Sequence, residues 1–191
     1  MPTTFDFHAE ASHDVPHILE MIKELADYEK DLKAVEATEQ TLLSTLRHAP
    51  SPGAAPSGPG YAQTLLLRVP ASASASTNST STNPSHSYAS PAGEVVGMAL
   101  YFYNYSTWRS APGIYLEDLY VRPEYRKRGY GKTLIQALAK ETLKIGGKRL
   151  QWSCLKWNEP SLQFYRSLGA LEQDEWAGLR VEGDALDKLA A

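Results

Sequence analysis

The sequence predicts an α/β (α+β) protein with a mixed central sheet that contains one parallel strand pair and is flanked by helices. Short apolar stretches bounded by turn residues, at 61–69, 94–103 and 114–121, are typical of strands. Residues 131–145 place apolar side chains at helical spacing, and a further strand is expected at 149–157. A strand, a helix and a strand in this order form a parallel pair with a right-handed crossover.

Two helical segments are expected before the strands. The first follows Ser12 and Asp14, which both favour helix starts, and runs to about Glu29. Its apolar residues at helical spacing are Val15, Ile18, Leu19, Ile22, Leu25 and Ala26. We expect this helix to pack on the sheet. A second, shorter helix is expected from Thr38, a good N-cap, to Leu46.

Two segments interrupt this pattern. Residues 49–60 are rich in Pro, Gly, Ala and Ser and break the second helix. Residues 71–92 are almost wholly Ser, Ala, Thr, Asn and Pro, with too few bulky apolar residues to offset the entropy lost on ordering. We expect a disordered low-complexity insertion between two strands. The 191 residues, 42% of them hydrophobic, have room for one core, so a single domain over residues 1–191 is expected.

The remaining elements follow from local signals in the second half of the chain. A turn at 108–113 separates two of the strands, and two glycines close the helix at 131–145. The last strand is expected over Arg149 to Trp157. A final helix begins at Asn158, an N-cap followed closely by a proline, and ends at Gly169.

Composition excludes several classes of function. A net charge of −3 and a pI near 6.0 argue against a nucleic-acid partner. Without a basic and apolar leader or an apolar stretch of membrane length, a cytoplasmic protein with no membrane partner is expected. The single cysteine and five scattered histidines suggest neither an internal disulfide nor a metal site. Cys154 is expected in mid-strand as a small core residue rather than a nucleophile.

A glycine-containing basic run is the most informative motif. Arg126-Lys127-Arg128-Gly129-Tyr130-Gly131 lies between a predicted strand and a predicted helix. The glycines let the backbone approach a ligand closely, and the free amide N–H groups of a helix start bind anions. A phosphate-bearing cofactor is therefore predicted. The basic cluster Arg122, Arg126, Lys127, Arg128 and Lys132 fits a compact polyanion, with a solvated helix face as the alternative.

Two commoner phosphate loops do not fit this run. Gly131-Lys132-Thr133 reads like the end of a P-loop, but Arg126 stands where that loop needs a glycine. The dinucleotide fingerprint requires its third glycine where Leu134 stands. The remaining pattern, Arg-x-x-Gly-x-Gly, resembles the one that Gcn5-related N-acetyltransferases use to bind the pyrophosphate of acetyl-CoA.

Glu117 and Asp118 form a carboxylate pair inside an otherwise apolar strand. Adjacent strand residues face opposite sides, so at least one carboxylate meets a core, a cleft or a subunit partner. A cleft that receives a cation would satisfy that charge, whereas an edge-strand charge or a structural salt bridge is the alternative.

Tyr165 has two interpretations. Its spacing with Leu162 and Leu168 predicts a packed side chain on the last helix. Its place after the last parallel strand also suits a proton donor to a departing thiolate.

Longer stretches carry a more specific family resemblance. They are Ile18 to Glu29, Ile114 to Val121, Trp157 to Ser161, Phe164-Tyr165 and Gly169-Ala170. In order and spacing they resemble the diamine acetyltransferases, the spermidine/spermine group within the Gcn5-related fold, over nearly the whole chain except 49–60 and 71–93. The resemblance implies a Gcn5-related acetyltransferase fold with a splayed parallel pair, acetyl-CoA as cosubstrate, a small amine as substrate and a homodimer.

The same resemblance implies site residues. The cofactor would contact Leu119, Tyr120, Val121, Arg126, Lys127, Arg128, Gly129, Tyr130, Gly131, Lys132, Asn158 and Ser161. The amine site would include Tyr28, Glu29, Glu117, Asp118 and Trp176. Tyr165 matches the general acid of the family, against its spacing alone, and Glu117 would accept the amine proton through ordered water. The amine would then attack acetyl-CoA directly.

The resemblance leaves the amine open. Ser106 stands where polyamine-selective members tend to carry aspartate, and there the chain resembles the thialysine acetyltransferases. Tyr28-Glu29 and the Asn-Glu-Pro-Ser helix start resemble the polyamine branch, so spermidine-type diamines are placed first. A thialysine or lysine-like amino acid is the alternative. A protein lysine acetyltransferase and a non-catalytic acyl-CoA-binding module are further ones.

Overall fold

The computed structural model of the chain describes residues 4–6, 11–48, 60–70, 89–90 and 93–191. The chain divides into two compact units, Met1–Ser153 and Cys154–Ala191. The predicted single domain stays a prediction. The predicted insertion at 71–92 lies outside the described residues, apart from residues 89–90, which form a short strand.

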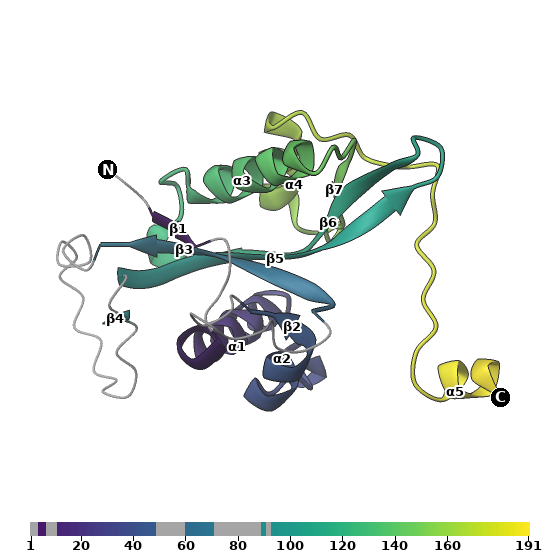
Figure 1. The fold of residues 1–191 in the computed structure, drawn as a ribbon, viewed down its shortest axis with the longest axis horizontal. Helices are drawn as coiled ribbons and strands as arrows, with labels where there is room; N and C mark the ends of the chain where they lie inside the picture. Colours follow the sequence, from purple (N-terminus) through teal and green to yellow (C-terminus); the bar gives the residue numbers. More distant parts are fainter. Residues whose placement is uncertain (1–3, 7–10, 49–59, 71–88, 91–92) are drawn as a thin grey trace. The chain divides into compact units, whose positions relative to one another are not determined.

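A mixed sheet organises the first unit (Figure 1). Its strands are β1 (Thr4–Asp6), β2 (Leu46–Arg47), β3 (Ala62–Val69), β4 (Ala89–Ser90), β5 (Gly93–Ser106), β6 (Ala111–Val121) and β7 (Leu150–Trp152). Along the sheet the described strands run in the order β1-β3-β5-β6-β7, with β2 beside β3 and β4 beside β5. β6 and β7 are parallel, whereas β3, β5 and β6 are antiparallel neighbours. The predicted mixed sheet with a parallel pair is confirmed.

Helices cover both faces of this sheet. The first unit contains α1 (Ala11–Tyr28), α2 (Glu39–Thr45), α3 (Tyr130–Lys144) and two short 3-10 helices, η1 (Leu32–Ala34) and η3 (Pro123–Tyr125). The second unit contains α4 (Glu159–Ser167) and α5 (Asp184–Ala190). In Figure 1, α1 and α2 lie on one face of the sheet and α3 lies on the other. As predicted, Thr38 caps α2, its side chain accepting a 3.2 Å hydrogen bond from the N–H of Thr41.

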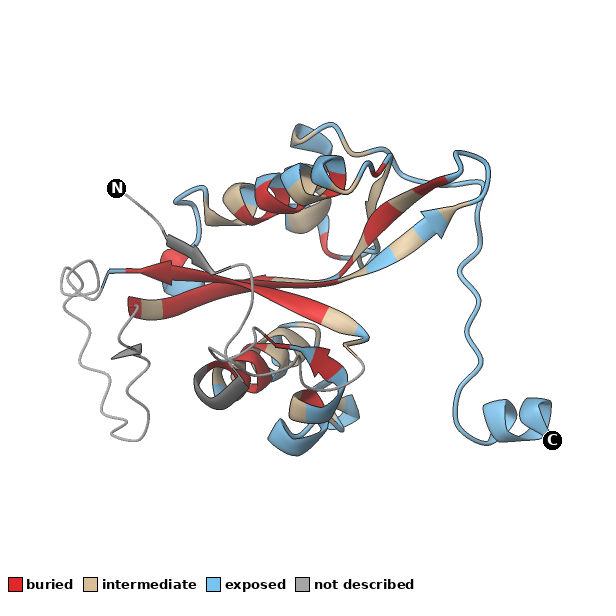
Figure 2. Cartoon of the chain, viewed as in Figure 1, coloured by how far each residue is buried: buried red, intermediate tan, exposed pale blue. Residues whose placement is uncertain are grey.

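The core lies on both sides of the central strands. Buried residues gather along β3 and β5 and on the helix faces turned toward them (Figure 2). On the α1 side the buried cluster includes Ile18, Met21, Leu66, Met98 and Tyr120. Leu134 and Leu138 of α3 are also fully buried. Because helices cover both faces, residues 63–69 of β3 are all buried rather than alternating in exposure.

Two strand boundaries differ from the prediction. β6 begins at Ala111, because the Pro-Gly that resembles a turn lies within the strand. A Cβ on Gly113 would stand 2.5 Å from Oδ1 of Asn104 and 2.8 Å from the carbonyl oxygen of Arg149, so only glycine fits there. β7 ends at Trp152 instead of Trp157. The prediction of Cys154 in mid-strand is therefore wrong.

A bulge in β6 positions the candidate site. Leu100 pairs with Asp118 and the next residue, Tyr101, pairs with Leu116, so Glu117 is an extra residue in the ladder. The bulge puts Asp118 on the α1 side of the sheet. The pairing of β7 with β6 ends at Leu116, so within the described residues β6 continues from Glu117 paired with β5 on one edge and with no strand on its β7 edge. This is the splayed parallel pair that the family resemblance implied.

Candidate active site

The start of α3 presents a row of amide N–H groups. Among the described residues, no backbone hydrogen bond from the N–H groups of residues 127–132 is seen. The first helical bond runs from the N–H of Thr133 to the carbonyl oxygen of Gly129, at 3.0 Å. Unpaired N–H groups and the positive end of the helix dipole together favour an anion. This loop therefore fits a pyrophosphate.

The backbone conformation of the loop explains this exposure. Gly129 is the N-cap of α3 and has a φ of 84°, in the left-handed region that glycine adopts without strain. Lys127 also has a positive φ, of 61°. A Cβ at Gly129 would meet nothing within 4 Å, so the space beside the loop is open to a ligand. The structure thus fits the backbone part of the predicted cofactor site.

Arg126 contacts protein groups with its side chain. Nε donates a 2.8 Å hydrogen bond to the carbonyl oxygen of Val121. The guanidinium carbon lies 5.4 Å from the ring centroid of Tyr28 and 5.5 Å from that of Tyr120. Both distances are within the range of cation–π contacts. Arg126 therefore connects the cofactor loop to the end of α1.

The other basic side chains of the run differ in their surroundings. Arg128 donates a 3.1 Å hydrogen bond to the carbonyl oxygen of Glu124, and its guanidinium carbon lies 5.2 Å from the ring centroid of Tyr125. Lys127 and Lys132 are exposed. These positive groups contribute to the field around the open amides.

Arg122 was predicted to belong to a basic cluster that binds a polyanion, and the structure contradicts this prediction. Only 3% of this residue is exposed, and Nη2 pairs with Glu20 of α1 at 2.8 Å. Nε lies 3.3 Å from a carboxylate oxygen of Glu24, and Nη1 donates to the carbonyl oxygen of Val95. Arg122 binds α1 to the sheet, and its charge is neutralised before any polyanion arrives.

The predicted amine-site residues at the end of α1 are placed by a Schellman motif. Lys30 has a φ of 66°, its N–H donates to the carbonyl oxygen of Asp27, and the N–H of Asp31 donates to that of Ala26. Tyr28 and Glu29 are the last residues before this reversal. The chain leaves the helix here, so both side chains lie at the C-terminal end of α1.

Three predicted carboxylates interact electrostatically near the end of α1. Asp118 is half-buried, and burial together with the charges of Glu117 and Glu29 raises its pKa to about 6. Burial also raises the pKa of Glu29. Desolvated carboxylates that repel one another are stabilised by an incoming cation. The arrangement suits an ammonium group.

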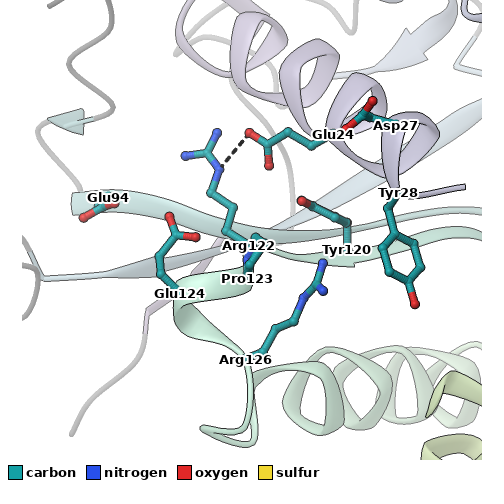
Figure 3. A pocket seen from close by; sticks show the side chains of 9 residues that line it. All are labelled: Glu24, Asp27, Tyr28, Glu94, Tyr120, Arg122, Pro123, Glu124 and Arg126. Atoms are coloured by element: carbon teal, nitrogen blue, oxygen red, sulfur yellow. Dashed lines mark ion pairs between the residues drawn. The ribbon is translucent and has the colours of Figure 1, made fainter. Parts of the chain in front are cut away.

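An open pocket of about 440 Å³ lies beside Arg126 (Figure 3). It is lined by Glu24, Asp27, Tyr28, Glu94, Tyr120, Arg122, Pro123, Glu124 and Arg126. Figure 3 shows the side chains of Tyr28 and Arg126 on adjacent walls. Tyr28 belongs to both this pocket and the predicted amine set, whereas Glu29, Glu117 and Asp118 lie outside the lining.

The predicted pantetheine segment lies on the part of β6 that extends beyond its pairing with β7. Leu119 and Val121 are half-buried, and the side chain of Tyr120 is buried on the α1 side. Burial and the nearby carboxylate of Glu24 raise the pKa of Tyr120 to about 12. The side chain of Tyr120 is thus engaged by Glu24 and by the guanidinium of Arg126.

The remaining predicted residues belong to the second unit. Asn158 is the N-cap of α4, and its Oδ1 accepts a 3.4 Å hydrogen bond from the N–H of Ser161. The ring of Tyr165 is half-buried and lies 5.2 Å, between centroids, from that of Phe164. Trp176 is 71% exposed. Their roles toward the cofactor and the amine stay predictions.

Sequence reasoning missed the contact of Arg126 with Tyr28 and Tyr120. Glu24 was missed too, although its carboxylate interacts with both the Tyr120 hydroxyl and the Arg122 guanidinium. These residues come from α1, β6 and the loop, and no local spacing joins them.

Among the described residues, no helix combines the length and apolar character of a bilayer-crossing segment, and no cluster of three metal-ligating side chains is found.

Comparisons with known proteins agree with this geometry. Residues 61–170, more than half of the chain, match the acetyltransferase (GNAT) family. A thialysine N-epsilon-acetyltransferase of Bos taurus is 33% identical over 180 residues, which cover 93% of this chain and 92% of that protein. An L-ornithine N5-acetyltransferase of Arabidopsis thaliana is 31% identical over 198 residues, covering 92% of this chain and 83% of the relative.

A solved structure is similar in fold. An integron cassette protein from the mobile metagenome of V. cholerae superposes with a TM-score of 0.69, at 24% identity, over all of this chain and 98% of that one. GNAT acetyltransferases take their acetyl group from acetyl-CoA, the ligand that the open amides of the loop at 127–132 fit. The chain belongs to the acetyltransferase (GNAT) family.

Proposed function

We propose that this protein acetylates a primary amine of a small diamino compound, of the thialysine or ornithine class, at a site beside Glu117 and Asp118. The observation that carries the proposal is the setting of Asp118, where burial together with the charges of Glu117 and Glu29 raises its pKa to about 6. Two relatives that each span more than 90% of this chain are named for thialysine and ornithine, which each carry a second charged group near the reacting amine.

The cofactor half of the site rests on the backbone. The amides of residues 127–132 and the dipole of α3 would hold the pyrophosphate. The part of β6 beyond its pairing with β7 would receive the pantetheine arm. When bound there, acetyl-CoA supplies an activated acetyl thioester. Asn158 and Ser161 are proposed as further contacts.

The amine half must bind a cation and then remove a proton from it. A primary amine has a pKa of about 10 and is protonated at neutral pH, so it cannot attack until it loses that proton. Asp118 and Glu29 would attract the charged group that does not react. Glu117, which is exposed at the bulge, would accept the proton of the reacting nitrogen through water. Trp176 is proposed as an aromatic neighbour of the amine.

The leaving thiolate needs a proton. We assign this role to the hydroxyl of Tyr165, on α4. Because the amine attacks the thioester directly, no acyl-enzyme is required. Cys154 is half-buried and its Sγ lies 3.7 Å from the carbonyl oxygen of Leu155.

Spermidine-type polyamines are the second candidate. The three carboxylates favour them, since a longer polycation gains from each negative charge. Ser106 favours the shorter substrate, because polyamine-selective members tend to carry aspartate at this position. It is half-buried near the end of the β5–β6 hairpin. A homodimer is also proposed on the family resemblance, and light scattering on the purified protein tests its mass.

Initial rates with acetyl-CoA on thialysine, ornithine, lysine, spermidine and a histone-tail peptide, measured in one assay, test the substrate. We expect kcat/KM for thialysine or ornithine to exceed that for the peptide by at least about tenfold. A preference for spermidine would select the second candidate. Acetylation of the peptide alone would reject both, and binding of acetyl-CoA without turnover would indicate a non-catalytic module.

A further inference from the structure

Arg126 has a position that phosphate binding alone does not explain. We infer that its guanidinium is a positioning group, which couples the cofactor loop to the amine site by holding Tyr28 at the end of α1. The inference rests on the proposed function, because it assigns a role in amine binding to a residue of the cofactor loop. Arg126 would act through Tyr28 and would not touch the reacting atoms.

The contacts of Arg126 span three elements. Its main-chain N–H donates to the carbonyl oxygen of Pro123 at 3.2 Å, and Nε donates to that of Val121 at 2.8 Å. The guanidinium lies 5.4 Å from the Tyr28 ring and 5.5 Å from the Tyr120 ring. A flat cation between two rings is an arrangement that arginine makes and lysine does not reproduce. The side chain therefore joins β6, the loop and α1.

The partner ring at Tyr120 is itself fixed. Tyr120 is buried, its hydroxyl interacts with the carboxylate of Glu24, and Glu24 pairs with the buried Arg122. Tyr28 is more exposed, at 38%, and lies in the last turn of α1. Of the two rings, Tyr28 is the one whose position a change at Arg126 can alter.

Tyr28 is next in sequence to one of the proposed amine-site carboxylates. It precedes Glu29, whose charge acts on Asp118 across from the end of α1. The amides that fit the pyrophosphate begin at Lys127, the residue after Arg126. A ligand that orders those amides also fixes the backbone of Arg126. Binding at the loop is thereby transmitted to the end of α1, and by reciprocity amine binding strengthens coenzyme binding.

Hydrogen–deuterium exchange tests the coupling without any amine. In the wild type, saturating coenzyme A should slow exchange at residues 24–31 by about threefold or more. Arg126→Gln should remove most of this protection while the loop itself stays protected. Arg128→Gln is the matched control, since it removes the same charge from the same loop and its ring partner is Tyr125, not a residue of α1. Equal protection of residues 24–31 in all three proteins would overturn the inference.

Kinetics on the preferred amine supply the second readout. Both variants share any loss of acetyl-CoA affinity due to charge, but only Arg126→Gln should raise the amine KM, by about fivefold. Tyr28→Leu should raise it similarly, and the double variant Tyr28→Leu with Arg126→Gln should be no worse than Tyr28→Leu alone. Effects that multiply in the double variant would show that Arg126 acts independently of Tyr28 and would overturn the inference. A rise in the acetyl-CoA KM alone would overturn it too and would make Arg126 a direct phosphate ligand. If the wild type acetylates no amine, the proposed function fails and the exchange result still decides the coupling.

Discussion

Arg122 at the end of β6 donates a 2.8 Å hydrogen bond from Nη2 to the carboxylate of Glu20 on α1. The same guanidinium lies 3.3 Å from the carboxylate of Glu24. Because Arg122 immediately precedes the short helix η3 and the cofactor loop, this pairing fixes where the loop begins relative to α1. This buried ion pair therefore links the cofactor loop to α1, whose end carries residues of the proposed amine site.

Arg122→Ala is expected to lower the free energy of unfolding by about 3 kcal/mol, because it leaves two half-buried carboxylates without their cation. Urea unfolding measures the change. Lys144→Ala is the control: it removes an exposed ion pair with Glu141, of 3.2 Å, and should cost less than about 1 kcal/mol. Similar losses in the two variants would show that the Arg122 pairing contributes no more than a surface contact.

Asp118→Asn is expected to stabilise the protein at neutral pH while weakening amine binding. The pKa of Asp118 is about 6 in the folded protein against 3.8 ordinarily, so wild-type stability falls as pH rises from about 4 to about 6. The variant lacks this loss and should be more stable by about 1–2 kcal/mol at pH 7.5 and no more stable at pH 4. Urea unfolding at both pH values decides it, with the exposed Asp27→Asn as control. A destabilised variant at pH 7.5 would contradict the burial and charge repulsion that raise the pKa of Asp118.

Gly129→Ala separates the loop from general glycine effects. Gly129 and Gly146 have φ values of 84° and 71°, and an added Cβ meets nothing within 4 Å at either position. Alanine in this region should cost each variant about 1–2 kcal/mol of stability. Only Gly129→Ala should also weaken acetyl-CoA binding, by about tenfold in calorimetry, because it distorts the amides at the start of α3. Equal affinity in the two variants would remove Gly129 from the cofactor site.

Much of the fold could be predicted because its signals are local. Caps and apolar spacing mark α1, α2, α3 and α4, and a helix between two strands predicts the parallel pair β6–β7. The boundaries that failed depend on tertiary contacts. Gly113 is in a strand because Asn104 and Arg149 approach it closely, and the ladder with β7 ends where Glu117 bulges.

The candidate site divides in the same way. The amides of residues 127–132 follow from a motif that is continuous in sequence, and Asp118 was singled out as a carboxylate in an apolar strand. Only a family resemblance supplied Glu29. Charge alone could not distinguish Arg122, buried among carboxylates, from the exposed Lys127. The distinction depends on Glu20 and Glu24, which α1 brings to β6.

Tyr165→Phe tests the proposed general acid. Losing the hydroxyl should lower kcat by about 10- to 100-fold, because the departing thiolate then lacks its proton donor, with acetyl-CoA affinity and thermal stability nearly unchanged. Tyr61→Phe, at a residue that is 73% exposed, controls for loss of a phenol elsewhere. An unchanged kcat would leave Tyr165 as a packing residue of α4, as its spacing alone predicted.

The central claim is that the main-chain N–H groups at the start of α3 bind the coenzyme. Amide NMR spectra of the ¹⁵N-labelled protein, recorded while coenzyme A is added, test it residue by residue. We predict that the largest shifts fall on residues 127–132 and that the amides of Gly146 and Gly147, at the far end of α3, stay in place. Saturable shifts elsewhere with residues 127–132 unmoved would contradict the claim.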